Sequence, residues 1–287
     1  MSSAQSLEIP GFQVVQFLGS GARSTIWQIR DRQTNQLLAL KRVVKRHISD
    51  MRFLEQAVNE YKVATQLDHP VIRKIHRIHK IKRWLSLREV HLVMELCEGA
   101  TVQGNRPRSV LEVMRIFTDV AGALAYMNAR GFVHADMKPN NILVAPDGSV
   151  KIIDLGQSCP VGTVKTRIQG TPDYIAPEQV HRRPLDARTD VFNFGASLYW
   201  TLTGQAIPTV LPKRGGINIM TDQAIVPPEE VNPLVPSLLS KLVVDCIRTN
   251  PLHRPADLDG VVDRLGLITL TLTGSSVDAD PPARQGP

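Results

Sequence analysis

The sequence predicts an α+β protein in which strands come first and helices follow. Short β-prone segments fill most of the first hundred positions, interrupted by one amphipathic helical pattern over 51–67. Helical patterns over 110–130, 190–203, 237–249 and 255–265 then dominate the chain. With 287 residues, 43% of them hydrophobic, the chain is long enough to bury the core of one large domain or of two lobes.

Composition excludes some classes of protein and favours one compartment. No run of about 18 apolar residues occurs, so no membrane span is expected, and the first ten residues lack the apolar core of a signal peptide. The cysteines, Cys97, Cys159 and Cys246, are odd in number and lack metal-ligand spacing. They suit free thiols in a reducing compartment, so a cytoplasmic location is expected.

The net charge of +7 is moderate, but basic residues gather between positions 73 and 88. A surface for nucleic acid or for an acidic partner is one interpretation, and a solvated basic face is the favoured one. No nucleic-acid partner is therefore expected. The basic residues of this stretch are Arg73, Lys74, Arg77, Lys80, Lys82, Arg83 and Arg88.

The most informative stretch runs from His134 to Val144. A carboxylate (Asp136), a lysine (Lys138) and an asparagine (Asn141) precede an apolar β-prone run, and the proline between them disfavours a helix. The stretch is therefore predicted to be a loop that enters a short strand. A carboxylate to orient and deprotonate a hydroxyl, a cation for the transferred charge and an amide oxygen for a metal together fit phosphoryl transfer.

This stretch resembles the catalytic loop of protein kinases, H-R-D-x-K-x-x-N, with Ala135 at the position of the arginine. The resemblance implies that Asp136 accepts or orients the proton of the substrate hydroxyl and that Lys138 steadies the γ-phosphate. Small-molecule phosphotransferases of related fold share the shorter form of this motif. The motif alone therefore leaves both classes open.

A glycine-rich segment lies between two predicted strands, 12–18 and 25–30. Taken alone it is most simply a hairpin turn, but glycine also lets backbone N–H groups approach a phosphate closely. A Rossmann or P-loop turn would lead into a helix instead. Ser24 stands where the kinase pattern has its third glycine. The resemblance implies ATP contacts from Leu18, Gly19, Ser20, Gly21 and Ile26.

A lysine and a glutamate are predicted to pair. Lys41 ends the predicted strand 37–41, and Glu60 lies on the apolar face of the helix 51–67. Because an unpaired buried charge is costly, Glu60 needs a partner, and Lys41 is the natural candidate. The pair resembles the strand lysine and helix glutamate of kinases, which implies that Lys41 holds the α- and β-phosphates while Glu60 holds Lys41.

The next segments are assigned through the resemblance. Residues 71–89 follow neither a clean strand nor a clean helical period, and a strand followed by a basic loop over 80–88 is expected. The strand that starts at Val90 would lead to the connector between lobes, where the Glu95 carbonyl and the Cys97 N–H would bind adenine. Ala39 and Leu143 would complete the ATP site.

A second carboxylate motif follows the catalytic loop. The strand 150–153 ends at Asp154-Leu155-Gly156, which resembles the metal-binding D-F-G of kinases with leucine for phenylalanine. Asn141 and Asp154 offer hard oxygen ligands. The resemblance thus implies ATP and Mg²⁺ as cofactors, with Mn²⁺ as a substitute, and Asn141 and Asp154 as metal ligands.

The segment from Asp154 to Glu178 resembles a kinase activation segment closed by Ala-Pro-Glu, a platform that small-molecule phosphotransferases lack. Thr171, together with Lys138, points to serine and threonine as acceptors. Arg254 matches the family's arginine that pairs with Glu178. Asp190 is expected to open a helix and to anchor the catalytic loop.

The resemblance covers nearly the whole chain and implies a two-lobed protein serine/threonine kinase. We expect a kinase domain over 12–267, with a β-rich N-lobe over 12–97 and a mainly helical C-lobe over 98–267. Residues 1–11 would be an extension and 271–287 a disordered tail. ATP would lie between the lobes, and its γ-phosphate would pass to protein substrates and, by autophosphorylation, to the kinase itself.

Two alternatives remain open. Ser24, Ala135 and Leu155 depart from the family pattern, which motivates a pseudokinase or scaffold, although no residue expected to touch phosphate or metal is lost. A small-molecule phosphotransferase is the other alternative, and the activation segment argues against it. The proline- and glycine-rich residues 205–231 also depart from the family, and no function is assigned to them.

Overall fold

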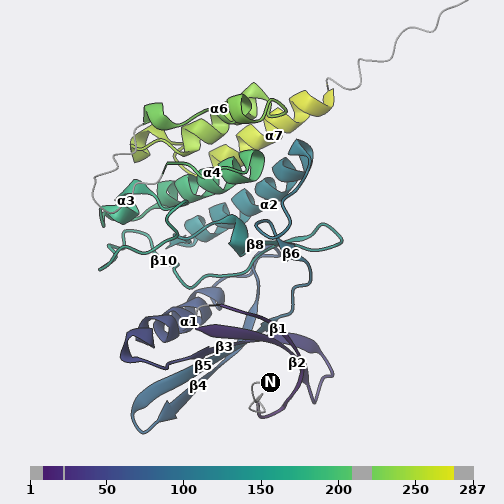
Figure 1. Ribbon diagram of the computed structural model, residues 1–287, viewed down its shortest axis with the longest axis vertical. Coiled ribbons are helices and arrows are strands. Elements are labelled where there is room, and N and C mark those ends of the chain that lie inside the picture. Colours follow the sequence, from purple (N-terminus) through teal and green to yellow (C-terminus); the bar gives the residue numbers. More distant parts are fainter. Residues whose placement is uncertain (1–8, 22, 209–221, 275–287) are drawn as a thin grey trace, which may run out of the picture. The chain divides into compact units, whose positions relative to one another are not determined.

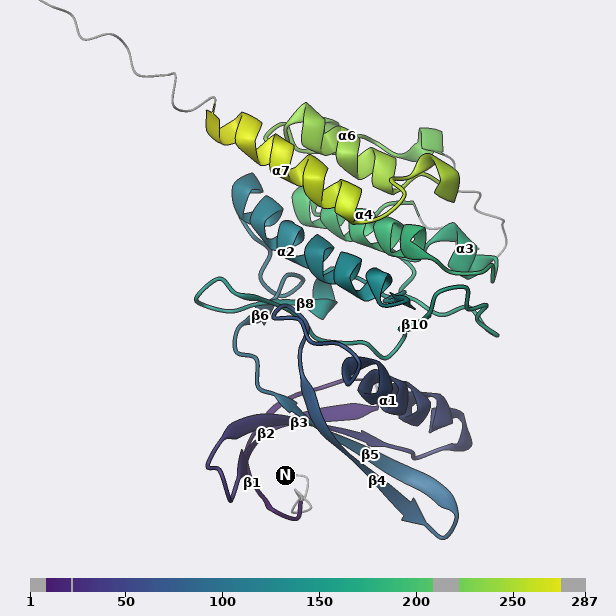
Figure 2. The same cartoon turned by 180° about the vertical axis from the view of Figure 1, so that it is seen from behind.

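The computed structural model describes residues 9–21, 23–208 and 222–274 (Figures 1 and 2). The chain divides into two compact units. Unit 1 contains the described residues up to Thr101 together with Asn140–Cys159, and unit 2 contains Val102–Pro139 and the described residues from Pro160 onward. A five-stranded sheet lies in unit 1 and the long helices except α1 lie in unit 2, which confirms the predicted α+β fold.

Unit 1 is built on an antiparallel sheet with the strand order β1-β2-β3-β5-β4. One helix, α1 (Met51–Ala64), lies along this sheet, and Leu54 and Ala57 of its apolar stripe are buried. The helix ends three residues before Leu67, its predicted end, but Leu67 is still buried. The strands are β1 (Phe12–Ser20), β2 (Ser24–Asp31), β3 (Leu37–Val44), β4 (Ile75–Arg83) and β5 (Ser86–Glu95).

The predicted basic loop over 80–88 is wrong, because β4 and β5 form a hairpin whose turn contains only Trp84 and Leu85. The apolar spacing of three in this segment has a physical cause. A register shift follows Ile75, so Ile75 and Ile78 pair with Met94 and Leu92, which lie on one face of β5. A bulged strand therefore breaks the period of two that sequence patterns rely on.

The rest of unit 1 is a small sheet with the order β6-β8-β9. Its strands are β6 (Ala100–Thr101), β8 (Ile142–Val144) and β9 (Val150–Ile152). The predicted turn at Asp147-Gly148 joins β8 to β9, and Gly148 has a φ of 84°, a conformation that favours glycine. The 3-10 turn η2 (Pro139–Asn141) leads into β8.

Unit 2 is a helical body centred on α4 (Ala187–Thr203), which is buried over most of its length. Gly195 permits the approach of its neighbour α6, because a Cβ at this position would lie 2.5 Å from the Cys246 Cβ. The other helices are α2 (Val110–Ala129), α3 (Pro177–Val180), α5 (Pro228–Val231), α6 (Ser237–Cys246) and α7 (Asp259–Gly274). Two short strands, β7 (Phe132–Val133) and β10 (Cys159–Pro160), and the 3-10 turns η3 (Asp222–Ala224) and η4 (Pro251–His253) follow. The 3-10 turn η1 (Ile48–Asp50), which precedes α1 in unit 1, completes the described elements.

The helix limits follow local capping. The Ser109 hydroxyl accepts a hydrogen bond from the Glu112 N–H (3.1 Å), so α2 starts where the sequence predicts. The prediction that Asp190 opens α4 is wrong: Asp186 caps this helix by accepting from the Arg188 N–H, and Asp190 lies one turn further on. Helix α7 continues to Gly274, past Leu265, where the amphipathic pattern ends.

Parts of three predictions lie outside the described residues. These parts are residues 1–8 of the N-terminal extension, residues 275–287 of the expected tail and residues 209–221 of the irregular segment. Within the described ranges, none of the helices combines the length and apolarity that a membrane span requires.

Candidate active site

The predicted pair of Lys41 and Glu60 is present in unit 1. The Lys41 Nζ donates to Glu60 Oε2 at 2.7 Å, and the Glu60 side chain is 1% exposed. A second carboxylate, Asp154, has its Oδ2 at 3.9 Å from the Lys41 Nζ. Burial alone would lower the pKa of Lys41, but the charges of Asp154 and Glu60 raise it above its ordinary value, so the ammonium stays charged.

Sequence reasoning missed a second cation on the same glutamate. Arg73 Nη2 lies 3.4 Å from Glu60 Oε1, and the guanidinium also donates to the carbonyl of Ile153. Arg73 therefore connects the helix glutamate to the residue that precedes Asp154. It was overlooked because it is the first of several basic residues in one stretch, and nothing in the local pattern marks it.

The glycine-rich segment joins β1 to β2, as predicted. Ser20 pairs with Thr25, and the Gly21 N–H donates to the Ser24 carbonyl at 2.8 Å. Arg23, the residue before Ser24, is tied to the start of α1 by an ion pair with Asp50 (2.8 Å) that the sequence did not reveal. Asp50 also accepts from two backbone N–H groups, those of Arg46 and His47. Burial alone would raise the pKa of Asp50, but the hydrogen bond from Arg23 and then these two backbone bonds lower it to about 2.

The predicted ATP-contact residues of the sheet share one face. Ile26 lies opposite Lys41 in the β2–β3 ladder, and Ala39, two residues before Lys41, points to the same side. Leu18 and Gly19 belong to β1 beside Ile26, and Gly19 pairs with it directly.

The predicted connector begins where β5 ends. The Glu95 carboxylate is held by Lys151 (2.6 Å) and by the Lys74 N–H (3.1 Å), which fixes the backbone at this position. Burial raises the pKa of the Cys97 thiol, whose sulfur makes a weak contact with the Glu95 carbonyl at 3.8 Å. Leu143, the last predicted ATP contact, lies in β8.

The two predicted metal ligands lie at one end of the β8–β9 hairpin. Asn141 immediately precedes β8, Asp154 follows β9, and the Ile153 N–H donates to the Asn141 carbonyl at 3.0 Å. Asp154 Oδ1 accepts from the Gly156 N–H at 2.9 Å, which orients the carboxylate. Within the described part of the chain, no cluster of three or more His, Cys, Asp or Glu side chains is placed to hold a metal. Two protein ligands of this kind suit a hard cation that takes its other ligands from phosphate and water.

In unit 2, Asp136 and Lys138 lie together with Thr171. Lys138 Nζ donates to Asp136 Oδ2 (2.9 Å) and to the Thr171 hydroxyl (2.8 Å). The Thr171 hydroxyl donates in turn to Asp136 Oδ1 at 3.0 Å. The three side chains form a closed triangle of hydrogen bonds, with the Asp136 side chain 12% exposed. A carboxylate, an ammonium and a hydroxyl in this arrangement can orient and deprotonate an alcohol.

Asp190 holds the loop that carries Asp136. Its carboxylate accepts from the N–H groups of His134 and Ala135, both at 2.9 Å, and from Asn128 Nδ2 at 2.8 Å. These bonds fix Ala135 at a φ of 60°, a backbone conformation that side chains disfavour. The predicted anchoring by Asp190 is therefore present.

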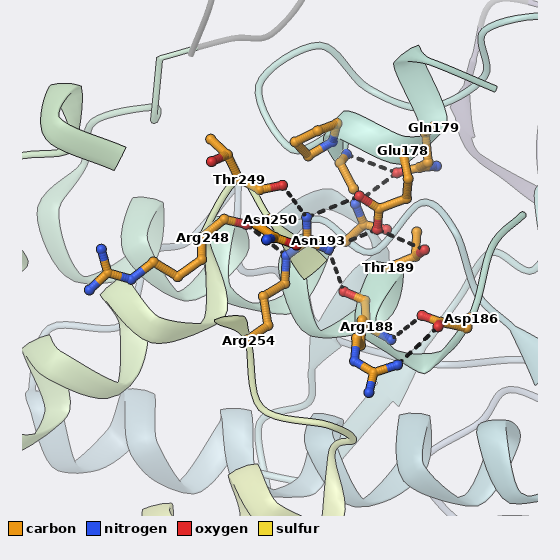
Figure 3. Close-up of polar contacts among 12 residues, drawn as sticks. Glu178, Gln179, Asp186, Arg188, Thr189, Asn193, Arg248, Thr249, Asn250 and Arg254 are labelled. Atoms are coloured by element: carbon orange, nitrogen blue, oxygen red, sulfur yellow. Dashed lines mark hydrogen bonds and ion pairs between the residues drawn. The ribbon is translucent and has the colours of Figure 1, made fainter. Parts of the chain in front are cut away.

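Glu178 and Arg254 form the predicted pair at the end of the activation segment (Figure 3). Arg254 Nη1 and Nη2 donate to the two Glu178 oxygens at 2.7 and 3.0 Å, and the Thr189 hydroxyl donates to Oε1. The remaining donors of Arg254 bind the carbonyls of Arg248, Arg188 and Thr249. All five guanidinium N–H groups are therefore satisfied.

A neighbouring residue that sequence analysis missed connects this segment to the loop. Gln179 Nε2 donates to the Ala135 carbonyl at 2.8 Å, and its Oε1 accepts from the Ala176 N–H and from Asn193 Nδ2. A neutral amide thus contacts the position where many kinases carry the arginine that receives a phosphate. The sequence offers no signal for this contact, because glutamine has no special spacing here.

Comparison with known proteins agrees with this geometry. A family profile described as "Protein kinase domain" matches residues 12–262. A probable serine/threonine-protein kinase of Clostridium acetobutylicum is 27% identical over 88% of this chain and 39% of its own length. An Aurora kinase of Candida glabrata is 29% identical (83% of this chain, 67% of the relative), and the serine/threonine-protein kinase PknA of Mycobacterium tuberculosis is 27% identical (85% and 58%). The chain spans about two fifths of the length of the Clostridium relative.

Proposed function

Because the chain belongs to the protein kinase family, as its motifs indicated, we propose that it transfers the γ-phosphate of ATP to serine and threonine hydroxyls of protein substrates. The observation that carries the proposal is the triangle of Asp136, Lys138 and Thr171 on an anchored loop. We infer autophosphorylation as a further activity. We also infer a cytoplasmic location, since the three cysteines are free thiols.

The family uses ATP and a divalent metal in general, and we assign Mg²⁺ here, with Mn²⁺ as a substitute. When bound, ATP supplies the phosphoryl group and the metal neutralises charge on its phosphates. Asn141 and Asp154 would hold the metal through oxygen atoms, which is the ligand type that Mg²⁺ prefers.

We assign the binding of ATP to residues of unit 1. Lys41, kept charged and directed by Glu60, would bind the α- and β-phosphates. The backbone of Gly19, Ser20 and Gly21 would lie close to phosphate oxygens, because the two glycines have no Cβ to keep a phosphate away. Leu18, Ile26, Ala39 and Leu143 would contact the adenosine, with the Glu95 carbonyl and the Cys97 N–H as hydrogen-bonding partners of adenine.

We assign proton transfer and orientation to residues of unit 2. Asp136 would hold the acceptor hydroxyl and take its proton, and Lys138 would stabilise the negative charge on the transferred group. For this, an incoming hydroxyl would take the place that the Thr171 hydroxyl occupies on Asp136 Oδ1. Positioning and charge stabilisation would provide most of the acceleration.

The test measures phosphate transfer from labelled ATP with Mg²⁺, to the protein itself and to a generic basic protein. Asp136→Asn is expected to lower the rate by a thousandfold or more, a loss on the order of 4 kcal/mol of barrier. Asp119→Asn, the same chemical change at a half-exposed position on α2, is the matched control and should retain the rate. Hydrolysis of the labelled protein should release phosphoserine and phosphothreonine. Phosphate found only on small metabolites, or equal rates in wild type and Asp136→Asn, would refute the proposal.

A further inference from the structure

The β4–β5 hairpin has an exposed apolar tip. Trp84 and Leu85, which form its turn, are 94% and 99% exposed, and Ile81 beside them is 42% exposed. Trp84 has a φ of 58°, so the turn itself is tight. A fully exposed tryptophan and leucine side by side are unusual on a protein surface, because exposing large apolar side chains to water is unfavourable.

The hairpin around this tip is basic. The sequence has no aspartate or glutamate from His69 through Arg88. The basic residues nearer the base of the hairpin have partners: Arg73 binds Glu60, and Lys74 binds Asp68. In contrast, no carboxylate of the described residues pairs with the four cations nearest the tip, which are all exposed: Lys80, Lys82, Arg83 and Arg88.

A second loop extends the surface. The N–H of Lys45, between β3 and α1, donates to the Arg88 carbonyl at 2.9 Å, so the β3–α1 loop adjoins the hairpin. Ile48 of this loop is 87% exposed and follows the exposed Arg46 and His47. The loop's own carboxylate, Asp50, is buried. Both views show the loop and the hairpin tip projecting from the same side of the sheet (Figures 1 and 2).

We propose that this surface docks the protein on an anionic lipid membrane. Trp84 and Leu85 would enter the boundary between headgroups and acyl chains, where tryptophan is favoured, and the four cations would contact anionic headgroups. The shape of the tip favours a lipid surface, rather than a folded protein, as its binding partner. A stable protein interface buries about 800 Å² per side against a complementary surface, whereas a convex two-residue tip needs no preformed pocket in a fluid bilayer.

The charge pattern supports the same occupant. A membrane of anionic lipids attracts each nearby lysine or arginine, and a single small apolar contact is too weak to hold a protein on it. The tip combines the two contributions on adjacent residues of one hairpin. The assignment does not depend on phosphoryl transfer, because none of its residues belongs to the proposed catalytic machinery.

The experiment mixes the full chain with vesicles of phosphatidylcholine alone, or of phosphatidylcholine with phosphatidylserine, and measures sedimentation. The protein should sediment with the anionic vesicles only, and less so at high salt. Trp84→Ala combined with Leu85→Ala should weaken binding by about tenfold or more. Each of Lys82→Gln and Arg83→Gln should weaken it by about fivefold. Brominated lipids should quench the part of the tryptophan emission that Trp84→Ala removes.

Leu234→Ala combined with Leu252→Ala, at leucines that are 77% and 76% exposed in unit 2, is the matched control and should bind like the wild type. Phosphate transfer without lipid should be equal in the tip variant and the wild type, which verifies that the variant is folded. Failure of the wild type to sediment with anionic vesicles would overturn the proposal. Equal binding of the tip variant would also overturn it, as would binding to heparin or RNA in place of vesicles.

Discussion

Two buried glutamates of this chain are each paired with a cation, but the two pairs are built differently. Glu60 and Lys41 in unit 1 form what we term the open pair, and Glu178 and Arg254 in unit 2 form the closed pair. The closed pair uses a bidentate contact, and the Arg254 side chain is 0% exposed. The open pair uses one short contact, and the lysine is 16% exposed.

The two pairs differ in how many N–H donors of the cation are already bonded within the protein. Arg254 uses every donor on Glu178 and three carbonyls, so it has no capacity for a ligand (Figure 3). Lys41 has three N–H donors, and among the described residues only Glu60 lies within hydrogen-bond distance of them. A saturated pair has donors only for the fold, whereas an unsaturated pair leaves donors available to a ligand.

Breaking the closed pair should have the largest effect. Arg254→Met leaves Glu178 buried without its cation, and we expect a loss of about 3–5 kcal/mol in the free energy of unfolding. Denaturant titration measures it. Arg248→Met, at a neighbouring arginine whose ion pairs are partly exposed, is the control and should cost no more than about 1 kcal/mol. A loss below 1 kcal/mol in Arg254→Met would contradict the structural role.

Breaking the open pair should affect activity more than stability. Lys41→Met should lower kcat/KM by about a hundredfold to a thousandfold, about 3–4 kcal/mol of barrier. Its stability should fall less than that of Arg254→Met, because Arg73 remains near Glu60. Arg42→Met, which breaks the adjacent surface pair with Glu89, should leave kcat/KM unchanged. Equal losses of kcat/KM in Lys41→Met and Arg42→Met would contradict a specific role of the open pair in activity.

Arg73 tests whether the open pair needs its second cation. Arg73→Met frees Glu60 Oε1 and the Ile153 carbonyl, and we expect about a tenfold loss of kcat/KM through poorer positioning of Lys41 and Asp154. Arg73→Lys should restore part of the loss, since a charge alone satisfies Glu60. Lys74→Met, at an exposed position, is the control. A drop in stability with no change in kcat/KM would identify Arg73 as purely structural.

The pair of Arg23 and Asp50 sharpens the comparison through pH. The folded-state pKa of Asp50 is lowered from 3.8 to about 2. The charged carboxylate therefore contributes its full stabilisation above pH 3.8, and this contribution is lost as the pH falls through about 2. Asp50→Asn should therefore lower the Tm at neutral pH, and the difference in Tm from the wild type should shrink as the pH falls from 3.8 to about 2. A difference in Tm that stays constant down to about pH 2 would show that the charge of Asp50 does not contribute to stability.

The smallest effect is expected in the activation segment. Gln179 and the closed pair hold the end of this segment, and Ala135 offers no cation that could pair with a phosphate. Replacement of Ser158, Thr163 and Thr166 together by alanine should change kcat/KM by no more than about threefold. Ser158 is 1% exposed, so Thr163→Ala/Thr166→Ala separates a packing loss from a phosphate effect. A loss of a hundredfold or more in the double variant would show that the segment depends on phosphorylation.

Features that depend on motif residues or on short hydrophobic periods could be predicted from the sequence. Lys41 and Glu60 pair as predicted, because a carboxylate on an apolar helix face requires a cation nearby. The α+β fold followed from apolar periodicity. The start of α4 was misplaced because two aspartates, Asp186 and Asp190, lie within one turn, and only geometry shows which one caps the helix.

Contacts between distant residues were beyond the sequence. Arg73 binds Glu60 from another element, and Gln179 reaches Ala135 across 44 positions, so neither leaves a local pattern. The β4–β5 hairpin was missed for a different reason. Its register shifts disrupt the alternation that marks a strand, although the hairpin is fully formed.

The closed pair also has a consequence for folding kinetics. Its partners are 76 positions apart, and bringing such distant residues together costs chain entropy before the contact repays it. The pair should therefore form after the transition state. Mutations that break it would then accelerate unfolding and leave the refolding rate nearly unchanged, so the pair sets the lifetime of the native state rather than the speed at which it is reached.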